Sequence, residues 1–261
     1  RDVFRAAEVR SEGAGPEVVL FADTFNTYFE PDNARAALTV LEAAGYQVRV
    51  VTPDDGRPLC CGRTFIAGGL VDEARHEARR MLAALSPYVA RGVPVVGLEP
   101  SCLFTLRDEF PALLPGEESQ RLAAQALLLE EFLAREQREG RLTLPLRAQP
   151  RKALLHGHCH QKAFAAMGAV EQALRLIPEL AVEVVDSSCC GMAGAFGYEA
   201  EHYEVSMAMG ELSLLPAVRG ADADTLIVAD GTSCRHQIHD GAGREAVHVA
   251  RVLAGALEGT A

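Results

Sequence analysis

The sequence predicts an α/β fold built from two similar halves, and two observations support this prediction. Short apolar runs typical of buried strands alternate with segments whose apolar residues recur at helical spacing, which favours parallel sheets covered by helices. A C-C-G motif also occurs twice, as L-C-C-G at 59–62 and S-C-C-G at 188–191, and each copy precedes another cysteine, Cys102 or Cys234. We therefore expect two pseudo-symmetric Rossmann-like modules, each a small, mostly parallel sheet with flanking helices.

The elements of the first half follow from its apolar pattern and from its helix-end residues. Residues 17–22 (E-V-V-L-F-A) predict the first strand. Pro31 begins a helix that we expect to end just before Gly45, because proline favours helix starts and glycine favours helix ends. The remaining predicted elements are strands at 47–52 and 93–98 and helices at 70–90 and 119–138.

The second half repeats this alternation. Strands are predicted near 152–156, 181–186 and 224–229, and helices near 163–176, 199–216 and 242–257. Residues 139–151 contain one glycine and two prolines, so they predict the join between the halves. We expect a first module at residues 1–145 and a second module at residues 146–261.

Composition and charge exclude several classes of protein. The 261-residue chain has a formal net charge of −11, which argues against a nucleic-acid or anionic-lipid partner. No apolar run approaches the ~20 residues needed to span a bilayer, and no signal peptide is visible. The seven cysteines are an odd number, so a reduced, cytoplasmic setting with metal or redox chemistry is favoured over a disulfide framework. The sequence begins without a Met, and we expect it to be a fragment of a longer protein.

Cysteines follow three different predicted strands of the second half. Ligands in parallel α/β folds collect beyond the carboxyl ends of strands. We therefore expect one rim of the sheet to gather four thiols, from Cys159, Cys189, Cys190 and Cys234.

Three interpretations of this set are open: buried structural cysteines, a structural zinc site and an iron–sulfur cluster. Adjacent cysteines point in diverging directions and rarely both reach one small tetrahedral ion, whereas a multi-iron cluster offers each thiolate a different iron. The cluster is therefore the preferred interpretation. Gly191 and Gly194 would let the backbone approach it closely.

The first half carries an incomplete version of this set. Thr24 stands where the second half has Cys159, which leaves three candidate ligands for a second metal: Cys60, Cys61 and Cys102. Three cysteines could hold a cluster with one open iron, a zinc ion, or nothing. Asp23 and Glu99 fall at the equivalent place, and we expect these carboxylates to be solvated loop residues.

Several polar residues surround the cysteines of the second half. His156, His158 and His160 flank Cys159 at alternate positions, and we expect them to be either outer donors and proton carriers or rim histidines without a role, rather than ligands. Lys162 would offset the negative charge of a cluster. The candidate outer residues are His158, His160, Lys162, Gly191 and His236.

The motifs around the cysteines resemble those of the CCG (cysteine-rich) domain. The phrases that carry the resemblance are D-T-F-N-T-Y-F-E-P, L-C-C-G-R, E-P-S-C, H-G-H-C-H-Q-K, C-C-G-M-A-G-A-F-G and D-G-T-S-C-R-H-Q-I. That domain occurs in heterodisulfide reductase and in iron–sulfur subunits of glycolate, lactate and glycerol-3-phosphate dehydrogenases. The phrases look most like the C-terminal iron–sulfur part of FAD-linked oxidases of the D-lactate or glycolate type. The family's terminal C-x-x-C is absent here, because L-F-T follows Cys102 and R-H-Q follows Cys234.

The resemblance implies an electron-transfer role in an FAD-linked 2-hydroxy-acid dehydrogenase or oxidase. A 4Fe–4S cluster would take electrons from a flavin in another domain or subunit and deliver them to a quinone, cytochrome or thiol acceptor. We expect the chain to be inactive alone, to bind no FAD itself, and to have a ferredoxin-type iron–sulfur domain as a further partner. Its expected location is the cytoplasm, peripheral to the inner face of the membrane through its partners. The alternative is a zinc-binding structural or docking module of an oxidoreductase complex.

Overall fold

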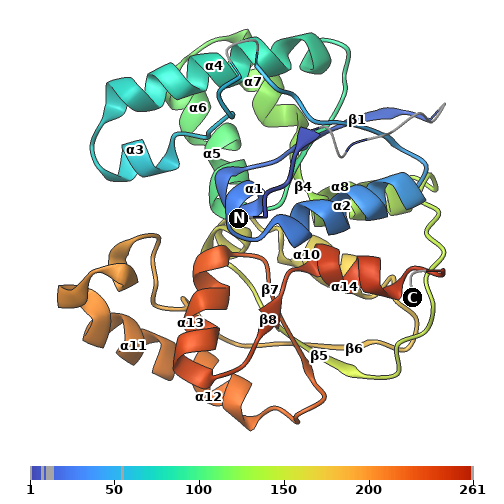
Figure 1. The fold of residues 1–261 in the computed structure, drawn as a ribbon, viewed down its shortest axis with the longest axis vertical. Helices are drawn as coiled ribbons and strands as arrows, with labels where there is room; N and C mark the ends of the chain where they lie inside the picture. The colour runs from blue at the N-terminus through green and yellow to red at the C-terminus, as the bar shows by residue number, and fades with distance from the viewer. Residues whose placement is uncertain (1, 7–8, 10–14, 54–55, 260–261) are drawn as a thin grey trace. The chain divides into compact units, whose positions relative to one another are not determined.

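The computed structural model describes residues 2–6, 9, 15–53 and 56–259. The chain divides into two compact units, Arg1–Leu144 and Pro145–Ala261 (Figure 1). Within the described ranges, no helix combines the length and the apolar character that a membrane crossing requires.

The first unit contains a four-stranded, all-parallel sheet in the order β2-β1-β3-β4. Its strands are β1 (Glu17–Phe21), β2 (Gln47–Arg49), β3 (Val95–Gly97) and β4 (Ala126–Leu128). Its helices are α1 (Thr24–Tyr28), α2 (Pro31–Ala43), α3 (Arg63–Ala67), α4 (Val71–Val89), α5 (Pro100–Arg107), α6 (Glu109–Leu113), α7 (Glu117–Gln125) and α8 (Leu129–Arg138). Gly45 has φ +85°, as expected for a glycine just past the end of α2.

The second unit has the same topology, with the sheet order β6-β5-β7-β8 and all pairs parallel. Its strands are β5 (Lys152–His156), β6 (Ala181–Val184), β7 (Leu226–Ala229) and β8 (Ala246–Val247). Its helices are α9 (Cys159–Ala163), α10 (Met167–Leu174), η2 (Phe196–Tyr198), η3 (Ala200–His202), α11 (Tyr203–Glu211), α12 (Leu214–Gly220), α13 (Thr232–Ala242) and α14 (Val249–Ala256). Helices α10 and α14 pack side by side in this unit (Figure 1).

The strand registers of the two sheets also match. The central strand β1 ends with Phe21 opposite Gly97, and the central strand β5 ends with His156 opposite Ala229. The two all-parallel sheets with flanking helices confirm the predicted α/β fold with pseudo-symmetric modules. The matching register also makes Phe21 and His156 structurally equivalent positions.

Two predicted helices are wrong because short strands interrupt them. The segment 119–138 was expected to be one helix, but Ala126–Leu128 forms β4 and pairs with β3. The segment 242–257 was also expected to be one helix, but it contains β8, and α13 begins ten residues earlier at Thr232. In both places pairing with a distant strand outweighs the local helical preference.

Other predicted elements are shorter or divided. The helix predicted at 163–176 is divided into α9 and α10, and Ala165, with φ +56°, lies between them. The helix predicted at 199–216 is divided into η3, α11 and α12. Cys102 and Cys234 lie in the first turns of α5 and α13, in segments for which the sequence pattern predicted no helix.

The core of each unit lies around its central strands. In the first unit Val18, Val95 and Val96 are fully buried, and in the second unit so are Leu155 and Val228. The three largest fully buried side chains, Phe104, Phe110 and Phe132, all belong to the first unit. The carboxyl ends of the strands are thus held by a tightly packed interior, which fixes the segments that follow them.

Candidate metal centre

Four cysteines of the second unit follow its three neighbouring strands β6, β5 and β7. Cys159 is the first residue of α9, after β5. Cys189 and Cys190 lie in the segment after β6, and Cys234 lies in the first turn of α13, after β7. Because carboxyl ends of parallel strands share one edge of a sheet, these segments meet there.

The thiols of this edge interact with one another. The Cys190 thiol contacts the thiols of both Cys189 and Cys234. Cys189 lies near enough to Cys159 for its charge to raise the pKa of the Cys159 thiol. Cys190 and Cys234 are buried, whereas Cys189 is half-buried and Cys159 is exposed. The set therefore runs from the interior of the unit to its surface.

Three thiols of this set, those of Cys159, Cys189 and Cys190, have raised pKa values that favour the protonated form. Contact with the Cys190 thiol and burial raise the pKa of Cys189 far above its ordinary value. Contact with Cys189 lowers the pKa of Cys190, but contact with Cys234 and burial outweigh this and raise it. Burial and the neighbouring Cys189 raise the pKa of Cys159. A bound cation would reverse this preference, because metal ligation stabilises thiolates and releases protons.

The last residue of β5, His156, is directed at the buried thiols. It is 1% exposed, and one of its ring nitrogens lies within 4.8 Å of the sulfurs of Cys190 and Cys234. Its Nδ1 lies 2.9 Å from Ser187 Oγ, while Nε2 has no hydrogen-bond partner among the described residues. Burial, together with Lys162 and His158, lowers the pKa of His156 to about 3, so the imidazole is neutral. The sequence pattern placed His156 among the histidines at the rim of the sheet, although the structure buries it. The one sequence signal for burial was its position as the last residue of a predicted central strand.

His158 lies against the segment that carries Cys234. Its Nδ1 accepts a hydrogen bond from His160 N at 3.1 Å and caps α9. A Cβ on Gly231 would lie 2.4 Å from His158 Cδ2 and 3.2 Å from the Cys234 sulfur. Gly231 therefore allows the His158 ring to approach the cysteine, and any side chain there would push the two apart.

A buried network connects the segment after β5 to the segment after β7. Gln161 Oε1 accepts from His158 N at 2.9 Å, and Gln161 Nε2 donates to Asp230 Oδ2 at 2.7 Å. Arg235 Nη1 donates to the carbonyl oxygens of Ala229 and Asp230. The network satisfies these buried polar groups and fixes the spacing between the cysteine-bearing segments.

The other predicted outer residues have defined places. Lys162 Nζ donates to Ser187 O and, at 3.1 Å, to Ser188 O, so it anchors the segment before Cys189. His160 stacks on His158, with 5.1 Å between ring centroids. His236 lies farther along α13 and pairs through Nδ1 with the Tyr198 hydroxyl.

Gly191 has a steric role beside the thiols. Its φ is +100°, and a Cβ there would lie 2.1 Å from Ser206 O. Its N–H also donates to the Cys189 sulfur at 3.3 Å. Gly194, by contrast, has φ +72° but open space around it.

The first unit repeats the cysteine arrangement without the fourth cysteine. The Cys61 thiol contacts both Cys60 and Cys102, and Gly62 N donates to the Cys60 sulfur at 3.4 Å, as Gly191 N does to Cys189. Thr24 begins α1, as Cys159 begins α9.

The expectation that the two carboxylates of this site are solvated is wrong. Asp23 is 1% exposed and Glu99 is 3% exposed. Burial and the nearby Glu99 raise the pKa of Asp23 to about 6. Contact with Cys61 lowers the pKa of Cys102, yet burial and these carboxylates together raise it to about 11. The Asp23 carboxylate also caps α1, where it accepts hydrogen bonds from Phe25 N and Asn26 N.

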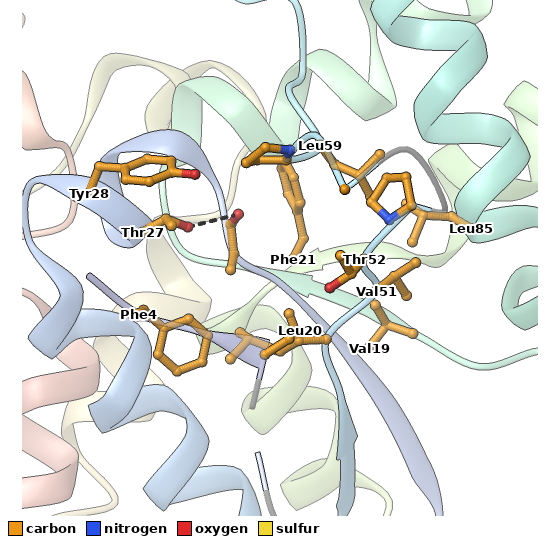
Figure 2. Close-up of a pocket in the computed structure, with 16 residues that line it drawn as sticks. Phe4, Val19, Leu20, Phe21, Thr27, Tyr28, Val51, Thr52, Leu59 and Leu85 are labelled. Carbon is orange, nitrogen blue, oxygen red and sulfur yellow. Dashed lines mark hydrogen bonds between the residues drawn. The ribbon is translucent and has the colours of Figure 1, made fainter. Parts of the chain in front are cut away.

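A small pocket of about 130 Å³ lies beyond the carboxyl ends of β1 and β2. Figure 2 shows the Phe21 ring, the residue equivalent to His156, close to Leu59 in this pocket. Thr27 Oγ1 donates to Ala22 O at 3.2 Å across the pocket wall (Figure 2). The first unit thus places an apolar ring where the second places an imidazole.

Residues 153–239 match the family model described as the cysteine-rich domain, CCG. Over 255 residues the chain is 32% identical to one of the subunits of anaerobic glycerol-3-phosphate dehydrogenase of Escherichia coli (strain K12), covering 97% of this chain and 62% of that protein. It is 27% identical to D-2-hydroxyglutarate dehydrogenase of the same organism, covering 88% of this chain and 22% of that protein. Lactate utilization protein A of Bacillus licheniformis is 26% identical, with 91% of this chain and 98% of that protein covered.

These matches confirm the resemblance to the CCG domain family that the motifs predicted. The relatives include parts of dehydrogenases, which are oxidoreductases. The chain spans 62% of the length of the matching glycerol-3-phosphate dehydrogenase polypeptide.

Proposed function

We propose that the second module is an iron–sulfur electron-transfer module of an oxidoreductase. The proposal starts from the match of residues 153–239 to the cysteine-rich domain of the CCG family. Its cluster ligands would be Cys159, Cys189, Cys190 and Cys234. When bound, a 4Fe–4S cluster would carry single electrons between a flavin and a further acceptor. The observation that carries the proposal is the contact among the thiols of Cys189, Cys190 and Cys234 at one sheet edge.

The donor set fits a cluster better than a single small ion. Thiolates are the usual ligands of iron–sulfur clusters, and neighbouring cysteines can reach different irons of an extended group. The buried Nε2 of His156 has no hydrogen-bond partner among the described residues, so the pocket contains a donor atom available for a metal. Glycine at positions 191 and 231 keeps side-chain atoms out of the space around the thiols.

The chain's own residues would set the properties of the site. The Gly191 N–H donates to a cysteine sulfur, and such hydrogen bonds tune the potential of a cluster. Lys162 supplies positive charge close to the thiols, which offsets the charge that thiolates bring. Burial of Cys190 and Cys234 excludes water from the inner side, while exposed Cys159 leaves one side open to a partner.

The partners and substrate are proposed from the names of the relatives and the family resemblance. We propose that a flavin-bearing domain or subunit oxidises a 2-hydroxy acid, of lactate, glycolate or 2-hydroxyglutarate type, or a polyol phosphate such as glycerol 3-phosphate. A ferredoxin-type iron–sulfur domain and a quinone, cytochrome or thiol acceptor complete the proposed pathway. The proposed location is cytoplasmic, at the inner face of the membrane through partners.

We also propose that the first module is a degenerate copy that binds a divalent cation such as zinc and has a structural or docking role. The supporting observation is that buried carboxylates of Asp23 and Glu99 lie near the Cys102 thiol. Their negative charge favours a cation with net positive charge over an anionic thiolate cluster. Zinc accepts both thiolate and carboxylate ligands.

Anaerobic reconstitution with iron and sulfide, followed by iron and acid-labile sulfide analysis and electron paramagnetic resonance, tests the main proposal. We expect a brown protein whose iron is lost in Cys189→Ser and retained in the matched first-module variant Cys60→Ser. A colourless wild-type protein that contains zinc alone, or full iron content in Cys189→Ser, would contradict it.

A further inference from the structure

We propose that His156 is a nitrogen ligand of the metal centre in the second module, beside Cys190 and Cys234. This inference rests on the proposed iron–sulfur function and goes beyond it, because the sequence pattern placed this histidine among the outer donors. The centre would then have five protein ligands, the four cysteine sulfurs and one imidazole nitrogen.

The geometry of the three side chains carries the proposal. A ring nitrogen of His156 and the sulfurs of Cys190 and Cys234 all lie within 4.8 Å of one another, and all three residues are buried. The three residues come from the end of β5, the segment after β6 and the first turn of α13. Side chains from three separate segments thus converge on one point in the interior, where a metal could replace the thiol protons.

The two nitrogens of the imidazole have different surroundings. Nδ1 lies 2.9 Å from Ser187 Oγ, whereas Nε2 is buried and lacks a hydrogen-bond partner among the described residues. A buried polar atom without a partner is costly in a folded protein. Ligation to iron through the Nε2 lone pair would remove that cost.

The segment around Ser187 can accommodate the tautomer that ligation requires. Lys162 Nζ donates to the backbone oxygen of Ser187 and lies 3.3 Å from its hydroxyl oxygen. An ammonium group can only donate, so Ser187 Oγ accepts from it and still has a lone pair that can accept the Nδ1–H of His156. A histidine ligand commonly donates its second ring N–H in this way, which orients the ring and strengthens the other nitrogen as a ligand.

The equivalent position in the first module supports a role specific to the second. Phe21 ends β1 at the register position at which His156 ends β5. Both positions are buried, so the fold itself accepts an apolar ring there. An imidazole with an unpartnered nitrogen at the same position is therefore not explained by packing.

Pulsed electron paramagnetic resonance on the reconstituted chain, reduced under anaerobic conditions, tests the proposal. The chain is labelled with ¹⁵N-histidine, and we expect a nitrogen hyperfine coupling typical of a directly bound imidazole. His156→Ala should abolish the coupling. His156→Cys should also abolish it but keep the iron, and its reduction potential should fall, because thiolate replaces imidazole. His239→Ala, which alters an exposed residue on α13, should leave the coupling intact.

The outcomes separate this inference from the function on which it rests. If the wild-type chain takes up no iron, the proposed function and the inference both fail. If it takes up full iron and shows no directly bound nitrogen, only the inference fails. A coupling that persists in His156→Ala and disappears in His158→Ala would overturn it in favour of the neighbouring histidine. Circular dichroism of His156→Phe, which copies the first module, checks that the fold survives the loss of the imidazole.

Discussion

The carboxyl ends of β1 and β5 occupy equivalent places in two sheets of identical order, yet their surroundings differ in chemistry. The first ends in Phe21 next to a small pocket, with the buried carboxylates of Asp23 and Glu99 nearby. The second ends in His156, with Lys162 near the thiols. The strand order and register are thus the same in both modules, while the side chains at the strand ends differ.

This difference in side chains is what would let one scaffold hold the two kinds of site that we propose. Strand order and register depend on backbone pairing and on a buried apolar interior, which many sequences satisfy. The charge at the carboxyl edge of each sheet depends on a few side chains that follow the strands, such as Asp23 and Glu99 in the first module and Lys162 in the second. Carboxylates favour a cation, whereas a lysine and the neutral imidazole of His156 favour an assembly of thiolates. Exchanging or removing the residues that distinguish the two modules tests this contrast.

Cys159→Thr should have the largest effect, because it gives the second module the residue found at Thr24. Loss of a direct ligand should weaken cluster retention by more than the ~10–100-fold that loss of an outer-shell partner costs. Iron and sulfide analysis after anaerobic desalting measures this. Cys60→Ser is the matched control in the first module. Unchanged iron content in Cys159→Thr would remove Cys159 from the ligand set.

Gly191→Ala and Gly62→Ala test the same position of the C-C-G motif in the two modules. A Cβ at Gly191 would lie 2.1 Å from a backbone oxygen, whereas at Gly62 the nearest atoms lie 3.4 Å away. Both glycines have positive φ, so each substitution costs roughly 1–2 kcal/mol from backbone strain alone. We expect Gly191→Ala to reach about 4 kcal/mol, because the backbone must also move. Urea unfolding of the metal-free variants measures the difference, and equal losses would contradict the steric argument.

Asp23→Asn tests the buried carboxylate that only the first module carries. The pKa of Asp23 is raised from 3.8 in the unfolded chain to about 6 in the folded chain. The folded state therefore binds this proton more tightly, and the stability it contributes below pH 4 is lost as the pH rises through 6. The loss is about 3 kcal/mol, given ~1.4 kcal/mol for each unit of pKa shift.

The measurement is the free energy of unfolding of the metal-free chain between pH 4 and pH 8. Asn at position 23 can still cap α1, so the variant should differ mainly in lacking this pH-dependent component. If the free energy of unfolding has the same slope between pH 4 and pH 6 in the wild type and in Asp23→Asn, Asp23 does not titrate in this range.

Thr24→Cys should have the smallest effect, because it adds one thiol to a site that we propose already binds a cation. We expect the affinity of the first module for Co²⁺ to rise by about tenfold, as four sulfur ligands replace three. The titration uses chains that also carry Cys190→Ser and Cys234→Ser, which remove the second site. Unchanged affinity would mean that residue 24 does not reach the ion.

Much of the scaffold could be predicted from local sequence patterns. Short apolar runs predicted β1 and β5, and Pro31 and Gly45 predicted the bounds of α2. The helices predicted at 119–138 and 242–257 were wrong, because β4 and β8 form only by pairing with distant strands. Three residues such as Ala126–Leu128 carry too little local information to reveal that pairing.

The sequence by itself determined the duplicated α/β order and the placing of cysteines after strands, because strand periodicity and motif spacing are local properties of the chain. Tertiary structure alone decided that Asp23 and Glu99 are buried and that His156 approaches Cys190 and Cys234. Burial and convergence depend on residues far apart in the chain. A histidine at the end of a strand has the same local sequence pattern whether its ring faces solvent or buried sulfur atoms.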